Sequence, residues 1–384
     1  SSSTPWRPMR SVFKSRAKAI IKTGYLTIRG GALKAIAPLI QKQSLPALKS
    51  PQNILFIRVD RVGDMVLSTP VFAAAKRAFP EAHLVVLASP VNAPILKNNP
   101  HVDEVILYDC SASLGGNLHL LRSLRKRHFD LTFDLHDDDD LKTAWISWMM
   151  GSAHRIGYAG HGREIFLHRS LPRGDGKAHF VSRALELLND VGIDPVHTLP
   201  TIYLDDQERS WAKQWIADHG LREAKLIGIH PGAYYPTQRW PTAYYAELVR
   251  LIRERVGAEA ILFGGPGDRS VIDEILSRVP FSVITAIDSS IRRFFAILPH
   301  CRVLICNNSG PLHCAVALGV PTISFMGPTV KKRWMPVGNT HQVLRRDDLP
   351  CIGCNLGYCK INTHACMETI TPEAVLAILK EHFP

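Results

Sequence analysis

The chain has 384 residues, 46% hydrophobic and 21% charged, a balance typical of a folded protein rather than a disordered one. This length exceeds one typical core, so we expect two domains of roughly 150 residues. No apolar run of about 18 residues occurs, so no membrane-spanning helix is expected. The net charge of +12 is uneven, because residues 51–384 carry 36 basic and 34 acidic side chains. Such a nearly neutral body excludes a groove for nucleic-acid phosphates.

Residues 1–50 form a basic N-terminal arm with ten Lys or Arg and no Asp or Glu. Within it, residues 12–28 mix basic with apolar side chains, as a helix at a membrane surface does. Attraction to anionic lipids would hold such an arm at a membrane. A solvated tail and an organelle transit peptide are the alternative interpretations.

From residue 53 onward, short apolar runs alternate with longer helical stretches, which indicates an α/β fold with parallel sheets. The first series predicts strands over 54–59, 83–88, 104–108 and 131–135, with a helix over 71–79. The second predicts strands over 226–230, 260–263, 282–286, 303–306 and 322–325, with helices over 242–256, 272–279 and 312–318. A polar seam at 194–208 divides them, so we predict doubly wound domains over 51–200 and 201–384. Ligands should bind beyond the carboxyl ends of the strands.

The loop after the first strand runs from Arg58 to Asp64. Gly63 permits a tight turn there, and Asp64 stands at the entrance to the next helix. Two interpretations of Asp64 stay open at this point. It caps the helix by accepting backbone N–H groups, or it acts as a general base that takes a proton from an attacking hydroxyl.

Three loops of the second series offer groups that suit a nucleotide diphosphate. Backbone N–H groups and cations at helix N-termini bind anions, and glycines let a ligand approach the backbone closely. The residues concerned are His230, Gly232 and Arg239 in the first loop, Gly264, Gly265 and Asp268 in the second, and Ser309, Gly310 and His313 in the third. The alternative interpretation is that these residues serve side-chain packing and tight turns and bind no ligand.

Four cysteines, Cys351, Cys354, Cys359 and Cys366, lie within a short Cys-rich segment, 351–366. Four thiolates can close a tetrahedral site, so a structural Zn or Fe is one interpretation. Cys110, Cys301, Cys306 and Cys314 lie in apolar stretches and are expected to be buried free thiols. The acidic run 137–140 is interpreted as a solvated helix entrance. Magnesium binding by its carboxylates and a role in binding an acceptor molecule are the alternatives.

Taken together, these loops resemble glycosyltransferase family 9, the bacterial heptosyltransferases. The resemblance runs from about Asn53 to the C-terminus and follows the family's order of motifs. Those motifs are Val62-Gly-Asp64, Arg155-Ile-Gly-Tyr158, His230-Pro-Gly232, Arg239-Trp-Pro241, Gly264-Gly265, Asn308-Ser-Gly-Pro311 with His313, and Gly327-Pro-Thr329.

This resemblance implies a GT-B architecture, in which two Rossmann-like domains face each other across a cleft. It implies an ADP-heptose donor, inversion at the anomeric carbon and no cofactor required for catalysis. Asp64 matches the family's catalytic aspartate. Donor contacts fall on Gly63 and on the loops around 230–241, 264–268 and 308–313. Where the family usually carries Lys this chain has Gln238, and where it usually carries Asp this chain has Asn308. Loss of the cation at Gln238 would weaken stabilisation of the leaving diphosphate unless Arg239 takes over.

The resemblance implies heptose transfer to a hydroxyl of a lipopolysaccharide inner-core acceptor. The enzyme would act in the cytoplasm, peripherally at the inner membrane of a Gram-negative bacterium. Two alternatives remain. One is heptosylation of a protein hydroxyl, to which a metal-bearing Cys-rich segment is relevant. The other is a non-catalytic sugar-nucleotide-binding protein, which Gln238 and Asn308 favour.

Overall fold

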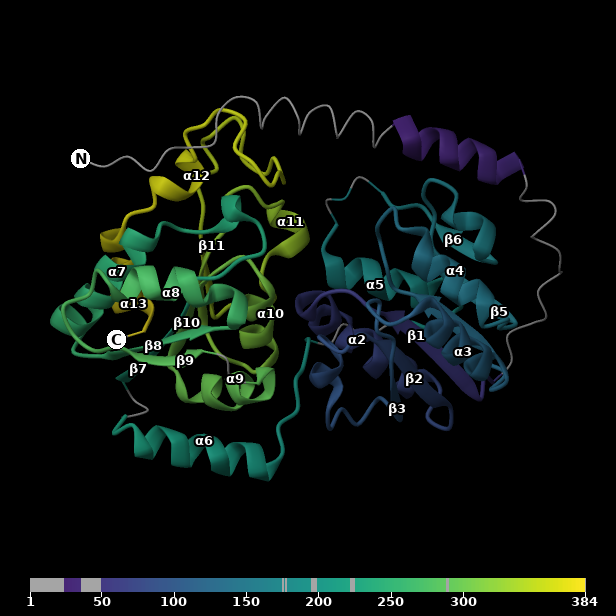
Figure 1. Ribbon diagram of the computed structural model, residues 1–384, viewed down its shortest axis with the longest axis horizontal. Helices are drawn as coiled ribbons and strands as arrows, with labels where there is room; N and C mark the ends of the chain where they lie inside the picture. The colour runs from purple at the N-terminus through teal and green to yellow at the C-terminus, as the bar shows by residue number, and fades with distance from the viewer. Residues whose placement is uncertain are drawn as a thin grey trace.

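The computed structural model describes residues 24–35, 50–174, 176, 178–194, 199–221, 225–287 and 290–383. These residues build two six-stranded sheets, each with helices on both faces (Figure 1). The first sheet has the order β3-β2-β1-β4-β5-β6 and the second the order β12-β11-β10-β7-β8-β9, with parallel strand pairs throughout. Both repeat the Rossmann strand order. The predicted α/β fold with two facing Rossmann-like units is confirmed.

The strands of the first sheet are β1 (Asn53–Arg58), β2 (His83–Ala88), β3 (Glu104–Leu107), β4 (Leu131–Asp134), β5 (His154–Tyr158) and β6 (Arg169–Leu171). Those of the second are β7 (Leu226–His230), β8 (Glu259–Gly264), β9 (Ile284–Ile287), β10 (Val303–Asn307), β11 (Thr322–Phe325) and β12 (His341–Leu344). The sequence did not predict β5, β6 or β12. In β5 the buried Ile156 and Tyr158 are interrupted by polar residues and a glycine, β6 is mostly exposed, and β12 is only half-buried. None of the three therefore presents the apolar run that marked the other strands.

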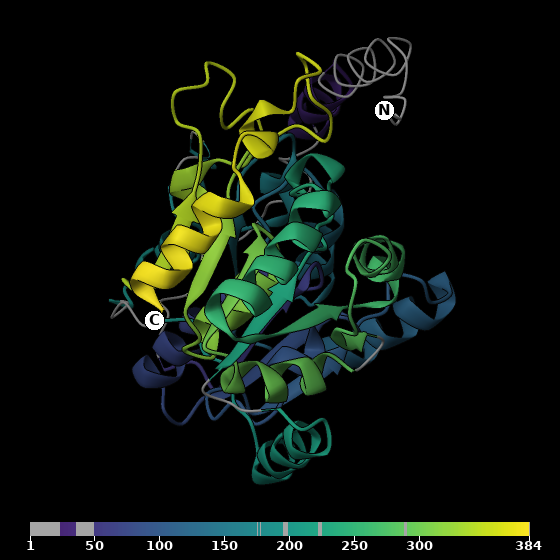
Figure 2. The same cartoon turned by 90° about the vertical axis from the view of Figure 1, so that its left-hand side faces the viewer.

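The helices of the first half are α2 (Val62–Ala78), α3 (Leu114–Arg125), α4 (Leu141–Met149) and α5 (Phe180–Asn189). Those of the second half are α6 (Asp206–Asp218), α7 (Thr242–Leu251), α8 (Arg269–Leu276), α9 (Ile291–Ile297), α10 (Gly310–Ala317), α11 (Lys331–Trp334), α12 (Ala365–Glu368) and α13 (Pro372–His382). Figure 2 shows α13 and α7 side by side over the second sheet. Helix α2 begins well before the predicted 71–79, because Pro70 lies inside it instead of starting it.

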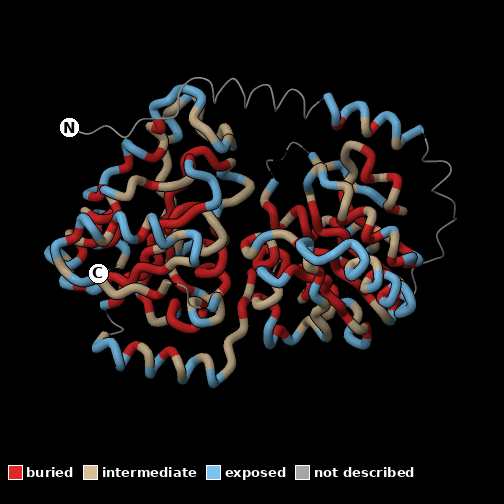
Figure 3. The backbone as a smooth tube through the Cα atoms, in the orientation of Figure 1, coloured by how far each residue is buried: buried red, intermediate tan, exposed pale blue. Residues whose placement is uncertain are grey.

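Both sheets are buried on their two faces, which places one core above and one below each sheet (Figure 3). In β1, Ile54 and Phe56 enter one core, whereas Leu55 and Ile57 enter the other. Phe56 stacks on Phe133 of β4 at a centroid distance of 5.1 Å and meets the edge of Phe72 in α2 at 5.2 Å. This aromatic group fixes α2 on the strand from which the first loop emerges.

Residues 199–204 lead from the first half to α6, whose N-cap Asp205 forms a capping box with Glu208. Arg292 of α9 donates to Glu208 Oε1 at 2.8 Å, and Lys97 of the first half lies 3.0 Å from the same oxygen. The connection is therefore tied to both halves. All strands of one sheet precede the seam at 194–208 and all strands of the other follow it, while the exact boundary at residue 200 stays a prediction.

Residues 24–35 of the basic arm form a helix that packs on the loop after β5. Leu26 and Gly30 are buried, and Arg29 donates to the carbonyl oxygens of His161 at 3.1 Å and Asp139 at 2.7 Å. Nearly all the other basic side chains of the arm lie outside the described residues. Within the ranges that the structure describes, no helix is both long and apolar enough to span a membrane.

We expect Phe56→Ala to lower the free energy of unfolding by about 3–5 kcal/mol, because it removes a fully buried ring from between two others. Urea denaturation followed by far-UV circular dichroism measures this change. Leu107→Ala, at a side chain that is 55% exposed, is the control and should change stability by less than about 0.5 kcal/mol. Equal effects of the two substitutions would contradict the assignment of Phe56 to the core.

Candidate functional site

A cavity of about 1770 Å³ lies between the two sheets, and the loops at the carboxyl ends of their strands line it. In each sheet these loops flank the point where the strand order reverses, between β1 and β4 and between β7 and β10. The structure brings every cleft residue predicted from the sequence to this cavity. They are Gly63, Asp64, His230, Gly232, Gln238, Arg239, Gly264, Gly265, Asp268, Asn308, Ser309, Gly310 and His313.

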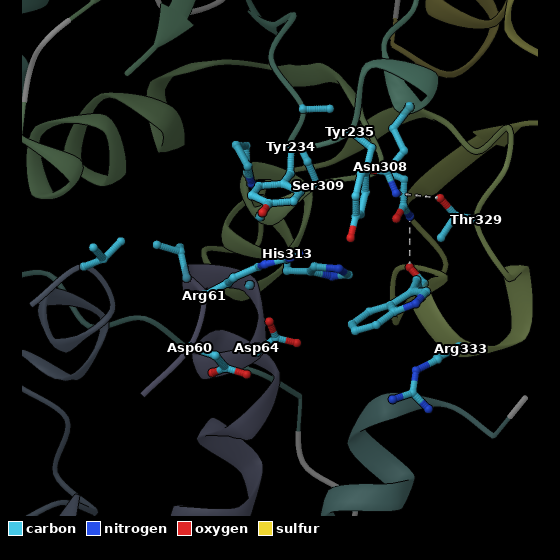
Figure 4. Close-up of a pocket in the computed structure, with 18 of the residues that line it drawn as sticks. Asp60, Arg61, Asp64, Tyr234, Tyr235, Asn308, Ser309, His313, Thr329 and Arg333 are labelled. Atoms are coloured by element: carbon cyan, nitrogen blue, oxygen red, sulfur yellow. Dashed lines mark hydrogen bonds between the residues drawn. The ribbon is translucent and has the colours of Figure 1, made fainter. Parts of the chain in front are cut away.

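Asp64 lies in the first turn of α2 and faces the opposite half of the molecule across the cavity (Figure 4). The N-cap of this helix is Arg61, so the interpretation of Asp64 as an N-cap is wrong. At Gly63 an added Cβ would lie 3.2 Å from Gly310 Cα and 3.3 Å from the His313 ring. The glycine thus permits the start of α2 to touch the start of α10, which places Asp64 directly across from the turn that opens α10.

Burial raises the pKa of Asp64 to about 6, and the nearby carboxylate of Asp60 adds to this rise. The positive charges of Arg58 and Arg61 and the His136 ring act in the opposite direction. A carboxylate with such a pKa is deprotonated at neutral pH, yet it binds a proton more readily than an ordinary aspartate. The site therefore contains a group suited to accepting a proton from a hydroxyl.

The loop after β7 begins at His230, and burial lowers the pKa of this imidazole. Its Nε2 lies 3.8 Å from Asp268 Oδ2, and the same oxygen accepts the backbone N–H of Gly265 at 3.1 Å. An added Cβ at Gly232 would lie 2.1 Å from Asp268 Oδ1, so only glycine fits there. Asp268 thus joins the loops after β7 and β8, a structural role that its sequence context did not indicate.

Further along this loop, Arg239 and Gln238 line the cavity. Arg239 Nε donates to Ala233 O at 2.9 Å, which anchors this side chain in its own loop. Gln238 Nε2 donates to Thr329 Oγ1 at 3.3 Å, so it bridges two cleft loops. Arg239 is accordingly the cation of this loop, and Gln238 supplies a neutral amide where the family usually has a lysine.

In the turn before α10, which lines the cleft, the backbone N–H groups of Ser309 and Gly310 have no hydrogen-bond acceptor among the residues that the structure describes. Ser309 is the N-cap residue and makes no capping bond with its side chain, while Pro311 occupies the first turn. Asn308 donates from Nδ2 to Trp334 O at 3.2 Å. Burial lowers the pKa of His313 to about 3, so its imidazole is neutral rather than a cation.

Two tyrosines of the second half, Tyr234 and Tyr235, also line the cavity and were not predicted from the sequence. The Arg61 guanidinium carbon lies 4.0 Å from the ring centroid of Tyr234 and 5.9 Å from that of Tyr235. Because Arg61 comes from the first half and the tyrosines from the second, this cation–π contact crosses the cleft (Figure 4). Two adjacent aromatics in a loop rich in Gly and Pro were the only signal in the sequence.

A second contact between the halves surrounds Trp334 in α11. Its ring stacks on Phe180 of α5 at a centroid distance of 5.2 Å. Beside it, Arg333 Nη2 donates to Asp137 Oδ2 at 3.1 Å, and His179 Nε2 donates to Met335 O at 2.9 Å. The contact joins residues far apart in the chain, so no local sequence pattern predicted it.

The acidic run after β4 is a helix entrance, as predicted, but it is not fully solvated. Asp140 is the N-cap of α4 and accepts the backbone N–H of Lys142 at 2.9 Å. Asp137 is buried against Arg173 at 3.2 Å and against Arg333. Through Asp137 and Arg333 the run contacts the second half, whereas its other ion pairs stay within the first half.

The four thiols of Cys351, Cys354, Cys359 and Cys366 lie near one another, and burial raises the pKa of Cys366 to about 11 with a contribution from the other three. In the part of the chain described here, no group of three or more Cys, His, Asp or Glu side chains is arranged to hold a metal ion. The interpretation as a structural Zn or Fe site therefore gains no support.

The Cys-rich segment instead packs behind the donor loop. Thr237 Oγ1 donates to Leu356 O at 2.7 Å, and His364 Nε2 donates to Thr237 O at 2.8 Å. Among the other cysteines, Cys301, Cys306 and Cys314 are buried as predicted, whereas Cys110 is exposed. Cys110 follows the exposed end of β3, and its sulfur accepts from Lys142 Nζ at 3.2 Å.

The chain is similar in sequence to curated heptosyltransferases. Lipooligosaccharide heptosyltransferase 2 of Haemophilus influenzae is 28% identical over 345 residues, which cover 86% of this chain and 99% of that protein. Lipopolysaccharide heptosyltransferase 2 of Escherichia coli K12 is 27% identical over 349 residues, covering 84% of this chain and 96% of that one.

Solved structures show the same fold. A family 9 glycosyltransferase from Veillonella parvula superposes with a TM-score of 0.79 at 23% identity, covering 88% of this chain and 99% of that chain. ADP-heptose lps heptosyltransferase II of E. coli superposes with a TM-score of 0.73 at 24% identity, covering 86% and 98%. The two facing sheets are therefore those of a GT-B enzyme. Residues 117–362 match the family model "Glycosyltransferase family 9 (heptosyltransferase)", and the chain belongs to this family of glycosyltransferases.

Proposed function

We propose that the protein transfers heptose from ADP-heptose to a hydroxyl of a lipopolysaccharide inner-core acceptor. The observation that carries this proposal is the position of Asp64 across a narrow cleft from the turn that opens α10. A proton acceptor and an anion-binding helix start then face the same space. Relatives named for this activity, which match almost over their full lengths, support the substrate assignment.

In the proposed reaction Asp64 takes the proton of the acceptor hydroxyl as that oxygen attacks the anomeric carbon of heptose. The new C–O bond forms on the face opposite the diphosphate, and the bond from the anomeric carbon to the diphosphate oxygen breaks, so configuration inverts. ADP leaves with the bonding electrons. Arg239 and the free N–H groups at the start of α10 stabilise its charge.

The acceptor is placed at the cytoplasmic face of the inner membrane, where lipid-linked core intermediates are exposed. The basic charge of residues 1–50 supports contact with anionic lipids there. The helix over 24–35 brings Lys34 to the rim of the cleft on the side of Asp64. A lipid-anchored acceptor and the arm would thus approach the same side of the enzyme.

A non-catalytic sugar-nucleotide-binding role is the second candidate, because Gln238 and Asn308 replace charged residues of the family. Purified protein mixed with ADP-heptose and a core acceptor lacking the terminal heptose distinguishes the two. We expect release of ADP and an acceptor heavier by one heptose in the mass spectrum. Binding of ADP-heptose without either product would favour the second candidate, and a product seen only with a protein acceptor would redirect the assignment to protein heptosylation.

Asp64→Asn should lower kcat by roughly 10²–10⁴-fold, because the amide cannot take the proton. The Kd for ADP, measured by isothermal titration calorimetry, should stay within about twofold. Asp109→Asn is the matched control, since Asp109 bonds Ser111 and does not line the cleft. Full activity of the Asp64 variant would remove this residue from the mechanism.

The pH profile of kcat should have an acid limb near pH 6. The carboxylate form of Asp64 is the active form, its pKa is raised to about 6, and so activity rises as pH increases through this value. Steady-state assays between pH 4.5 and 8 in buffers of constant ionic strength measure the limb. A limb at the pH of an ordinary aspartate, near 4, would contradict the raised pKa.

Gly232→Ala should raise the Kd for ADP roughly tenfold, because the new methyl group collides with Asp268 and displaces the loop after β7. Calorimetric titration with ADP measures the change. Gly115→Ala is the control, since its Cβ meets no atom within 4 Å and it lies in α3 away from the cleft. Unchanged ADP binding by the Gly232 variant would show that the loop does not contact the nucleotide.

A further inference from the structure

Three buried polar atoms beneath the cleft lack a hydrogen-bond partner among the described residues. They are Arg58 Nη2, Asp60 Oδ1 and His136 Nε2. Folded proteins pair nearly all such atoms, so three at one place call for a functional explanation. All three side chains also act on the charge of Asp64, either directly or through the Asp60 carboxylate.

Asp60 follows β1 and is held from two sides. Arg58 Nη1 donates to Asp60 Oδ2 at 3.0 Å, and His136 Nε2 lies 3.7 Å from the same oxygen. The Arg58 side chain is buried and its Nε donates to Ser68 Oγ at 3.1 Å. Ser68 Oγ in turn donates to the backbone oxygen of Asp64 at 2.7 Å. A continuous chain of polar contacts therefore links Asp60 to the helical turn that carries Asp64.

His136 follows β4, the neighbour of β1 in the sheet, and its ring is fixed. Its Nδ1 donates to Asp134 Oδ1 at 3.1 Å. Asp134 is fully buried and accepts from Arg163 Nη2 at 2.5 Å and from Thr143 Oγ1 at 3.0 Å. Because Nδ1 carries the proton of this bond, Nε2 is the nitrogen directed at Asp60.

Asp64 therefore stands among opposed charges. Asp60 raises the pKa of Asp64, whereas Arg58, Arg61 and His136 lower it. From the other half, α10 presents His313, whose lowered pKa keeps it neutral above pH 3. The balance at Asp64 is thus set within its own half of the molecule, by side chains from the ends of β1 and β4.

We propose that Asp60 and His136 are positioning residues for the transfer reaction, which act from beneath on the protonation of Asp64 in opposite directions. Asp60 keeps the base able to retain the proton it removes, and His136, oriented by Asp134, opposes this effect. The proposal rests on the assignment of Asp64 as the base. It gives a function to a pair of side chains that no motif marks.

The test is the pH profile of kcat for Asp60→Asn and His136→Gln. Removal of the Asp60 charge should move the acid limb to lower pH by on the order of one unit. Removal of the His136 ring should move the limb to higher pH, because this ring lowers the pKa of Asp64. Asp109→Asn, the matched loss of a carboxylate outside the cleft, should leave the limb in place. Losses of kcat that are equal at every pH, with an unmoved limb, would overturn the proposal, because a purely structural role predicts that result.

Because both side chains are buried or half-buried, the thermal unfolding of each variant is measured first. Asp60→Ser and His136→Asn replace any variant that does not fold, and the expected directions stay the same. A ¹³C titration of the Asp64 carboxyl group in the enzyme without substrate gives a second readout, with Asp64→Asn identifying its resonance. Opposite displacements of this titration in an enzyme without transferase activity would retain the inference and reject the proposed function. Absence of any displacement in an active enzyme would reject the inference alone.

Discussion

The close approach of two helix starts governs this molecule. Gly63 in α2 and Gly310 in α10 lie so close that a methyl group on the first would press against the second. Helix α2 follows β1 and helix α10 follows β10, and each of these strands lies where the strand order of its sheet reverses. The contact therefore joins the two places where Rossmann units bind ligands. A side chain larger than hydrogen at Gly63 would therefore press against the turn that opens α10, and this turn would have to shift.

A second set of contacts makes the two halves sensitive to each other. The Phe180 ring of the first half lies between Trp334, at a centroid distance of 5.2 Å, and the guanidinium carbon of Arg58, at 5.0 Å. Arg58 holds Asp60, while the backbone oxygen of Trp334 accepts from Asn308. The aromatic stack therefore connects a donor-side turn with the charged residues below Asp64. Movement of the halves would alter both at once.

The sequence predicted much of this arrangement because strand ends are local features. An apolar run followed by Gly, Asp, His or Ser was enough to place Gly63, Asp64, His230 and Ser309 at the carboxyl edges of the two sheets. His136 was missed because its relation to Asp60 depends on β4 lying beside β1, and this neighbourhood follows from strand order rather than from spacing. Trp334 and Phe180 were missed for the same reason: they meet across the two halves.

Asn308, which stands where the family usually has an aspartate, makes a hydrogen bond that an aspartate could not make. An aspartate at this position could not donate to the carbonyl oxygen of Trp334, whereas the Asn308 amide does so at 3.2 Å. The replacement removes a negative charge from the turn before α10, which favours an anion there. Gln238 removes a positive charge on the same side of the cleft, so together the two departures leave the net charge of these loops unchanged. In the proposed reaction they therefore compensate each other electrostatically, and Arg239 is the cation left to stabilise the departing ADP.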